Sequence, residues 1–339
     1  MPRTAVILLN LGGPDQLSSV QPFLQNLFRD PAIIRLPWIF REILAWVISR
    51  SRLREAQKIY AYLGGGSPLL KNTQIQSKAL EKALGKNFRV FIAMRYWYPF
   101  TQETITQVMA YQPDDVVLLP LYPQFSTTTT ASSLKCWIET ASKMGLNIPT
   151  KIIGCYPTAE GFIQAISELL EYSLQEFEDL SQAHILFSAH GLPKRIVESG
   201  DPYQTQVEQT ARAVINDLKI KSCSYSIAYQ SRVGPLEWIG PATETEIRRL
   251  GREKKNILLV PLSFVSEHSE TLYEIDYHYK ILAEKSGVRK FLRVPTVGIH
   301  PKFMGQMVEF CHQKNLVENF ICSTNIEKCI CREVMKKSV

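Results

Sequence analysis

The sequence has no uninterrupted apolar run of the roughly 20 residues that a membrane-spanning helix needs. Its most apolar long stretch, Pro31 to Arg54, is interrupted by arginines and a glutamate. Residues Met1 to Asn10 hold neither a secretory leader nor an Arg/Ser-rich transit segment. Seven cysteines, an odd number without an export signal, argue against a disulfide framework. We therefore expect a cytoplasmic protein.

A dense Lys/Arg block is also missing. The net charge of +7 is mild for 339 residues, so we expect no nucleic-acid partner. Such a surface suits anionic substrates, or a peripheral contact with the inner face of the plasma membrane. Hydrophobic residues at 45% and charged residues at 21% are typical of globular proteins.

Several catalytic and nucleotide-binding motifs are absent. Gly12-Gly13-Pro14 lacks the G-x-G-x-x-G spacing, and its proline removes an amide donor. Gly64-Gly65-Gly66-Ser67-Pro68 is not followed by G-K-[ST], so neither loop predicts a phosphate site. Neither H-E-x-x-H nor G-x-S-x-G occurs. This disfavours a nucleotide-dependent oxidoreductase, a zinc protease and a serine hydrolase. The glycines fit a permissive turn or a close backbone approach to a flat ligand.

Short apolar runs alternate with longer amphipathic ones, which indicates βα units and parallel sheets. The predicted strands are Ala5–Leu11, Val90–Tyr96, Val116–Tyr122, Thr150–Tyr156, His184–Ser188, Ser224–Gln230, Ile257–Phe264 and Leu292–Val297. Predicted helices include Thr73–Leu84, Ala159–Leu174, Gln204–Leu218 and Glu267–Glu284.

The pattern predicts an α/β protein of two Rossmann-like domains, each a four-stranded parallel sheet flanked by helices, with the active site in the inter-domain cleft. We place the first domain at 1–148, with a lip at about 31–62, and the second at 149–310. A cysteine-containing extension, 311–339, follows. The boundary is expected near Gly145–Pro149.

Ligands of open parallel sheets bind beyond the carboxyl ends of the strands. His190, in Ser-Ala-His-Gly-Leu-Pro, directly follows one predicted strand. A lone histidine there is more often structural, but the Gly and Pro that follow favour a tight turn that projects the imidazole. Such an imidazole can take a proton or bind a divalent metal. We therefore favour a catalytic role for His190.

Glu270, Glu274 and His278 follow another strand at a spacing of four, which places them on one face of a helix. Such a stripe is either a solvated face or a track for cations. Histidine and carboxylate ligands together suit Fe²⁺ and similar metals. The solvated-face interpretation stays open for Glu274 and His278, and is weaker for Glu270.

An aromatic segment near the N-terminus and a group of cysteines near the C-terminus each allow two interpretations. Ile33 to Tyr60 is apolar and aromatic with interleaved arginines, so it is either core or an amphipathic lip for an apolar anion or a membrane surface. The cysteines Cys311, Cys322, Cys329 and Cys331 crowd the C-terminus. Four thiolates can hold a [2Fe–2S] cluster. Because their spacing matches no reliable pattern, reduced and unligated cysteines are favoured over a cluster.

Taken together, the motifs resemble those of the ferrochelatase family, in particular the bacterial protoporphyrin ferrochelatases. The resemblance runs from the first strand to the end of the second domain. Its motifs are Leu8–Pro14, Gly64–Pro68, Arg95-Tyr96, Tyr122–Gln124, Ser188–Pro193, Gly200–Tyr203, Tyr229–Pro235, Trp238–Thr243 and Ser266–Asp276.

The resemblance implies an enzyme that inserts Fe²⁺, its substrate, into protoporphyrin IX to form protohaem without an organic cofactor. It implies that His190 and Glu270 bind the metal and take the pyrrole protons, and that Glu274 continues an acidic path. It also implies substrate-binding roles for Leu11, Arg52, Tyr60, Ser67, Arg95 and Trp238. Open alternatives are a coproporphyrin or other tetrapyrrole chelatase and a non-catalytic porphyrin or haem carrier.

Two positions depart from the family pattern. His278 stands where the family usually has an acidic residue, so the path is not wholly carboxylate. Ser126-Thr127-Thr128 stands where cluster-bearing relatives have an upstream cysteine. The C-terminal cysteines therefore cannot form that known arrangement, although another four-cysteine arrangement stays open.

Overall fold

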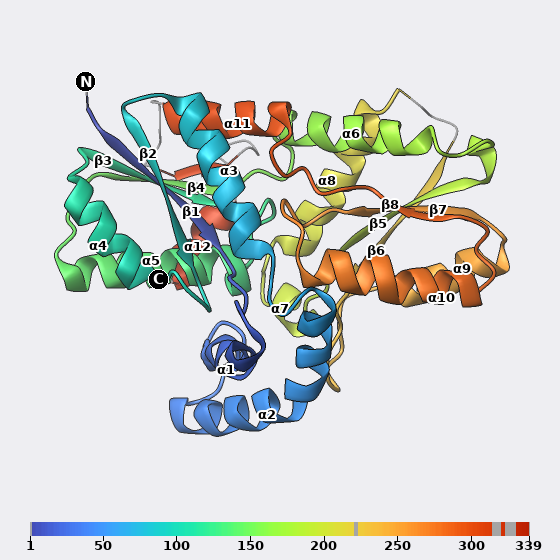
Figure 1. The fold of residues 1–339 in the computed structure, drawn as a ribbon, viewed down its shortest axis with the longest axis horizontal. Coiled ribbons are helices and arrows are strands. Elements are labelled where there is room, and N and C mark those ends of the chain that lie inside the picture. The colour runs from blue at the N-terminus through green and yellow to red at the C-terminus, as the bar shows by residue number, and fades with distance from the viewer. Residues whose placement is uncertain (1, 220–222, 314–319, 323–329, 339) are drawn as a thin grey trace. The chain divides into compact units, whose positions relative to one another are not determined.

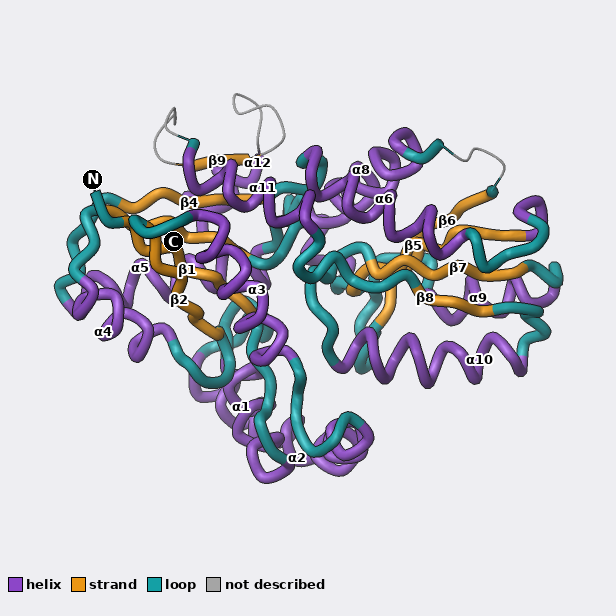
Figure 2. Tube along the Cα trace, turned by 45° about the horizontal axis from the view of Figure 1, so that its top comes forward, coloured by secondary structure: helices purple, strands orange, loops and turns teal. Residues whose placement is uncertain are grey.

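The structure, a computed structural model, describes residues 2–219, 223–313, 320–322 and 330–338. The chain divides into two compact units. Met1–Cys155 and Met307–Val339 make up the first unit, and Tyr156–Gln306 makes up the second. Each unit is built on a parallel sheet with helices on its faces (Figure 2).

The first unit contains, among the described residues, a five-stranded sheet in the order β2-β1-β3-β4-β9. Its strands are β1 (Thr4–Asn10), β2 (Phe88–Met94), β3 (Asp115–Pro120), β4 (Thr150–Cys155) and β9 (Phe320–Cys322). All neighbouring pairs are parallel. Every residue of β1, an interior strand, is buried, as expected for a strand covered on both faces.

Helices cover the first sheet (Figure 1). They are α3 (Leu69–Leu84), α4 (Thr101–Tyr111), α5 (Ser132–Met144) and α12 (Ile330–Ser338). Alternate residues of β1, Ala5, Ile7 and Leu9, pack in one core with residues of α4, α5 and α12. Helix α3 also packs on β1 and β2, and α11 (Pro301–His312) contains the boundary between the units.

Beyond the carboxyl ends of β1 and β2 lies a pair of helices, α1 (Val20–Arg29) and α2 (Trp38–Tyr62). Val20, Phe23 and Tyr60 form a small core with Tyr96, and Leu11 packs against it. The first half of α2 leaves most of its apolar side chains exposed. Among the described residues, no helix combines the length and apolarity needed to cross a bilayer.

The second unit contains a four-stranded parallel sheet in the order β6-β5-β7-β8. Its strands are β5 (Ala183–His190), β6 (Ser224–Gln230), β7 (Asn256–Pro261) and β8 (Phe291–Arg293). Its helices are α6 (Glu160–Leu174), α7 (Lys194–Glu198), α8 (Tyr203–Asp217), α9 (Thr243–Arg252), a π-helix (Glu270–Tyr279) and α10 (Lys280–Lys285). Apolar residues of α9, the π-helix and α10 share one core with the sheet.

The division into units differs from the sequence expectation at both boundaries. Thr150–Cys155 pairs with β3 and therefore belongs to the first sheet, so that unit extends past residue 148. The segment expected to be an extension, 311–339, returns to the first unit, where Phe320–Cys322 adds a fifth strand beside β4. A side chain at Gly154 would collide with the Phe320 ring, so glycine permits this pairing.

Candidate active site

His190 and Glu270 form a close pair at the carboxyl ends of the strands in the second unit. His190 is the last residue of β5, and Glu270 is the first residue of the π-helix that follows β7. Their Nδ1 and Oε2 atoms lie 2.7 Å apart. The two side chains are 39% and 23% exposed, so the pair remains accessible. The structure thus brings together the two residues predicted to handle the metal.

Ser231, just beyond β6, joins Glu270 to Glu274. Its hydroxyl lies 3.1 Å from Oε2 of Glu270 and 2.5 Å from Oε2 of Glu274. Its amide also donates to Glu274, at 2.9 Å. Ser231 has a φ of +60°, a left-handed conformation that non-glycine residues rarely adopt and that is frequent at functional sites.

Gln230 holds the carboxylate of Glu274 and the backbone carbonyl of Glu270. Its amide nitrogen donates to Oε2 of Glu274 at 3.1 Å, and its amide oxygen accepts from the hydroxyl of Ser188 at 2.7 Å. Both Gln230 and Ser188 are fully buried. Two adjacent strands therefore fix the Glu274 carboxylate before any ligand arrives.

The pKa shifts separate the two carboxylates. Burial by itself raises the pKa of Glu270, but the charge and hydrogen bond of His190 outweigh this and lower it to about 2. Desolvation lowers the pKa of His190, but Glu270 outweighs this and raises it above its ordinary value. Burial and the charge of Glu270 raise the pKa of Glu274. Glu270 is thus held ionised, whereas Glu274 takes up a proton more readily.

The helix that carries the two glutamates is wider than predicted. Glu270–Tyr279 is a π-helix, and the amide of Lys280 bonds to the carbonyl of Ile275, five residues earlier. Such segments are rare and often occur at functional sites. Glu270 and Glu274 still meet at Ser231, as the spacing of four predicted. His278 instead lines a separate pocket with Arg248 and Leu282.

Sequence reasoning gave no role to two side chains near this pair. His268 is buried against the ring of Phe264, and burial lowers its pKa. The hydroxyl of Tyr279 donates to Oε1 of Glu274 at 2.9 Å. His268 lies within the quoted motif, which could have signalled it. Tyr279 carries no sequence signal, because its placement depends on the π-helix.

Trp238 lies close to the turn that follows His190. Gly191 bonds to the carbonyl of Gln230 at 2.8 Å, and a side chain at Gly191 would come within 3.2 Å of the Trp238 ring. Trp238 also lines the pocket that contains His278. Glycine at position 191 thus lets the His190 turn pass between β6 and Trp238.

The predicted porphyrin contacts of the first unit gather beyond β1 and β2. Leu11 and Tyr60 pack in the same small core. The amide of Ser67 donates to the carbonyl of Pro14 at 2.7 Å, and a side chain at Gly13 would collide with Ser67. The two glycine-rich loops therefore approach each other closely. Arg52, on α2, is half-buried, and no described contact joins it to this group.

Arg95 belongs to a buried ion pair. Its Nη2 lies 2.8 Å from Oδ2 of Asp30, and its Nε donates to Ser132 at 2.8 Å. Tyr96 donates to the same carboxylate oxygen at 2.7 Å. Arg95 thus ties the end of β2 to α5 and to the residue that ends α1, a structural role beside its predicted contact with substrate.

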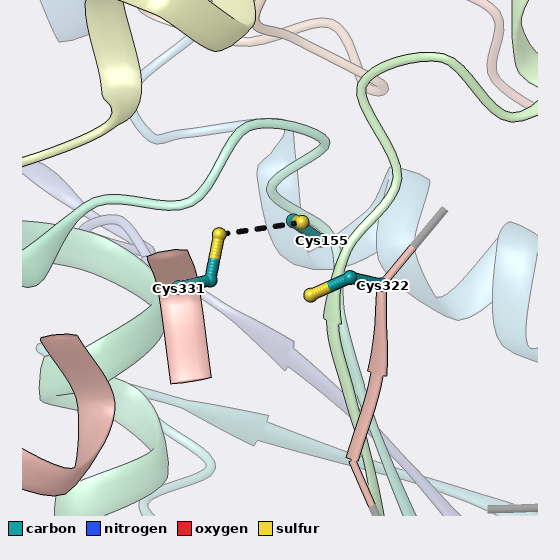
Figure 3. Close-up of side chains that lie close together, drawn as sticks. All are labelled: Cys155, Cys322 and Cys331. Atoms are coloured by element: carbon teal, nitrogen blue, oxygen red, sulfur yellow. Dashed lines mark hydrogen bonds between the residues drawn. The ribbon is translucent and has the colours of Figure 1, made fainter. Parts of the chain in front are cut away.

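Three cysteines converge in the first unit (Figure 3). Cys155 ends β4, Cys322 ends β9 and Cys331 lies in α12, and their sulfur atoms all lie within 4.8 Å of one another. The Cys155 and Cys331 sulfurs are 3.5 Å apart, too far for a disulfide bond and close to the about 3.8 Å between two thiolates on one tetrahedral metal. Cys329 lies outside the described residues.

Cys311 does not belong to this group of sulfurs. It is buried, and burial raises the pKa of its thiol to about 12. Its carbonyl accepts a hydrogen bond from the Lys151 ammonium at 2.7 Å. Cys155, which sequence reasoning did not single out, instead joins Cys322 and Cys331 because β4 and β9 are neighbours in the sheet.

Comparison of sequences identifies close relatives. The family model described as Ferrochelatase matches residues 3–315. A protein named Ferrochelatase from Caulobacter vibrioides is 47% identical over 344 residues, covering 98% of each chain. Another of that name, from Rickettsia bellii, is 46% identical and covers 97% of this chain and 95% of its own.

Solved structures share the fold at low sequence identity. SirB from Bacillus subtilis with Fe³⁺ superposes with a TM-score of 0.53 at 12% identity, covering 91% of this chain and 94% of its own. DR2241 from Deinococcus radiodurans, described as similar to chelatases, gives 0.53 at 13% identity over 94% of this chain and 57% of its own. At such identities the likeness concerns the fold alone.

Proposed function

This chain belongs to the ferrochelatase family, and from that premise we propose that it inserts ferrous iron into protoporphyrin IX to form protohaem. It is a metal-inserting chelatase of haem biosynthesis, an enzyme of the lyase class. The observation that carries the proposal is the contact of 2.7 Å between His190 and Glu270 at the strand ends. An accessible base held by a carboxylate suits metal capture and proton removal.

The chemistry explains these residue types. Insertion of Fe²⁺ releases the two pyrrole protons of the porphyrin, so the site needs a base near the ring nitrogens. Glu270 occupies Nδ1 of His190 and leaves Nε2 for the substrate side. The ionised Glu270 also stabilises positive charge that arrives with the metal or a proton. Ser231 holds both carboxylates in place and Gln230 holds that of Glu274, which limits reorganisation during the reaction.

We assign the porphyrin contacts to the residues that the family resemblance indicated. Leu11, Arg95 and Trp238 would line the porphyrin pocket, and Arg52, Tyr60 and Ser67 would meet the propionates. The location of the site in a cleft between the domains stays a prediction. A close-packed apolar site can distort a porphyrin and expose its nitrogen lone pairs.

The choice of porphyrin is tested by competition. Protein in anaerobic buffer receives Fe²⁺ with protoporphyrin IX, coproporphyrin III or an equal mixture, and each haem product is quantified by chromatography. We expect protohaem to dominate in the mixture. Dominant iron coproporphyrin would instead assign the chain to the coproporphyrin branch.

We further propose that the protein is cytoplasmic and makes a peripheral contact with a membrane through the first half of α2. Trp38 and Phe40 are 67% and 64% exposed, and Ile43 and Trp46 are exposed beside them. The Arg50 guanidinium lies 5.6 Å from the centre of the Trp46 ring. Exposed aromatic residues with interleaved arginines suit the boundary of an anionic bilayer.

Replacing both Trp38 and Phe40 with serine should weaken binding to vesicles containing anionic phosphatidylglycerol by more than about tenfold, since each aromatic ring buries apolar surface. Cosedimentation measures the binding. The matched control is Tyr172→Ser, which removes an exposed aromatic of α6 in the second unit. Equal binding by the double variant and the wild type would refute the α2 contact.

We also propose that Cys155, Cys322 and Cys331 bind iron, in a [2Fe–2S] cluster whose fourth ligand is a further thiolate. Sequence spacing favoured unligated cysteines, whereas three sulfurs within 4.8 Å of one another favour a bound metal. The donor set is of the thiolate type that holds such clusters. A cluster there would supply a cross-link among β4, β9 and α12.

Protein purified without oxygen should contain iron and acid-labile sulfide and show visible absorption that dithionite bleaches. Cys155→Ser should lose most of this signal and lower the thermal unfolding midpoint, because metal binding stabilises the folded segment. Cys136→Ser, a change at a half-buried cysteine of α5 outside the group, should keep both. Wild-type protein without iron or sulfide would rule out the cluster.

A further inference from the structure

A chain of hydrogen bonds continues beyond Glu274 to the surface of the second unit. The hydroxyl of Tyr279 lies 2.9 Å from Oε1 of Glu274 and 3.4 Å from Oε1 of Glu244. The Tyr279 ring is fully buried in the core beneath β5 and β7. Glu274 and Tyr279 are five residues apart, which is the hydrogen-bonding step of the π-helix.

Glu244 opens onto a pocket of about 470 Å³. It lies in the first turn of α9, is half-buried, and lines this pocket while its Oε1 atom lies near the hydroxyl of Tyr279. The pocket is also lined by Thr245, Arg248, Arg232 and His278. The hydrogen-bonded chain therefore leads from the buried end of the glutamate pair to solvent.

The charges of this pocket decide what can travel through it. Arg232 and Arg248 both line it, so it disfavours an approaching Fe²⁺ and attracts small anions. His278 also lines the pocket and adds no carboxylate that would attract a cation. This route repels metal ions. It ends at the carboxylate of Glu244, in a pocket that attracts small anions able to accept a proton, so it suits the release of protons.

We propose that Tyr279 and Glu244 form an exit branch for the protons that metal insertion releases; this rests on the proposed chelatase function. A protonated Glu274 gives its proton to the phenol oxygen of Tyr279 while the phenol proton passes to Glu244. Tyr279 is thereby restored, and Glu244 passes the proton to a buffer anion in the pocket. The longer contact, between the Tyr279 hydroxyl and Glu244, reaches the usual O–H···O distance when the Glu244 carboxylate moves about 0.6 Å closer.

If protons leave through Tyr279 and Glu244, removing Glu244 should lower kcat, and an added proton-carrying anion should restore it. Glu244→Ala should lower kcat about fivefold, less than the about 10²–10⁴ of a residue that acts directly on substrate. Added formate should restore most of the lost rate, because the anion enters the vacated pocket and carries protons. Sodium chloride at the same ionic strength should not. Glu244→Gln, which keeps the shape of the side chain, should show the same initial loss.

Other variants distinguish a loss of proton transfer from a loss of activity caused by damage to the fold. Tyr279→Phe should lose kcat similarly but resist rescue, because the missing hydroxyl is buried. Arg248→Gln in the Glu244→Ala background should raise the formate concentration needed for rescue. Glu253→Ala changes a residue at the other end of α9, away from the pocket. This variant should keep wild-type kcat, and added formate should not change it.

The outcomes distinguish the branch from the proposed function. Wild-type kcat in Glu244→Ala, or a loss that formate and chloride restore equally, would overturn the branch while leaving the chelatase function intact. A wild-type protein that inserts no iron would overturn the proposed function itself. Rescue of Glu244→Ala by formate alone, together with the unrescued Tyr279→Phe, would establish the branch.

Discussion

Replacing His190 with alanine should lower the rate of iron insertion by about 10³-fold, within the range that a positioned base contributes. Glu270 fixes Nδ1 of the imidazole at the end of β5, and in the proposed mechanism Nε2 is the atom that takes a proton from the substrate. Porphyrin affinity should change little, because the macrocycle depends mainly on apolar contacts. Anaerobic single-turnover fluorescence measures insertion, and porphyrin titration without metal measures binding.

The matched control is another histidine of the same strand. His184 hydrogen-bonds to Ser224 and Ser226, at 2.7 and 2.8 Å, and is the second residue of β5, at the opposite end of the strand from His190. His184→Asn should retain insertion per folded molecule. Near-native insertion by His190→Ala would refute its assignment as the base.

Replacing Glu270 with glutamine should slow insertion by about 10²-fold, whereas the same change at Glu274 should cost about tenfold. Glu270 contacts His190 directly, so its neutralisation removes the charge that orients and stabilises the imidazole. Glu274 acts one step further away, through Ser231. Both variants preserve side-chain volume, and the same single-turnover assay ranks them.

The reverse ranking would contradict this order of roles. It would mean that Glu274, rather than Glu270, acts at the reacting nitrogens. Ser231→Ala provides an internal check because it removes the hydroxyl that bridges the two carboxylates. Its effect should fall between those of the two glutamine variants.

The strands were predictable because apolar runs and their spacing report directly on buried parallel sheets. Ser224–Gln230 was predicted with its observed bounds, and the rule that ligands bind beyond carboxyl ends led to His190. The strand Phe320–Cys322 was missed because three residues are too few to show a period. Its pairing with β4 also moved the C-terminal segment into the first unit.

Contacts between distant segments were harder to predict. The π-helix cannot be distinguished from an α-helix by a spacing of four, because both bring Glu270 and Glu274 together. The position of Tyr279 between Glu274 and Glu244 depends on that wider turn. Cys155 was overlooked because it joins Cys322 and Cys331 only once β4 and β9 are neighbours.

The pairing of Arg95 with Asp30 shows the same limit for charged residues. The sequence marked Arg95 as a substrate contact through its motif, but it carried no sign that an aspartate 65 positions earlier would hold the guanidinium. Burial raises the cost of leaving either charge alone, so the pair forms when α1 packs beyond β2. Such pairings are determined by tertiary packing rather than by local pattern.

The most direct test of the central claim is the yield of haem per protein molecule. Purified protein in anaerobic buffer is mixed with Fe²⁺ and an excess of protoporphyrin IX, and protohaem is measured over time. We predict that haem accumulates well beyond one molecule per chain, at a rate that His190→Ala largely removes. Quenching of porphyrin fluorescence that stops at one molecule per chain, with no haem formed, would contradict it and identify a porphyrin carrier.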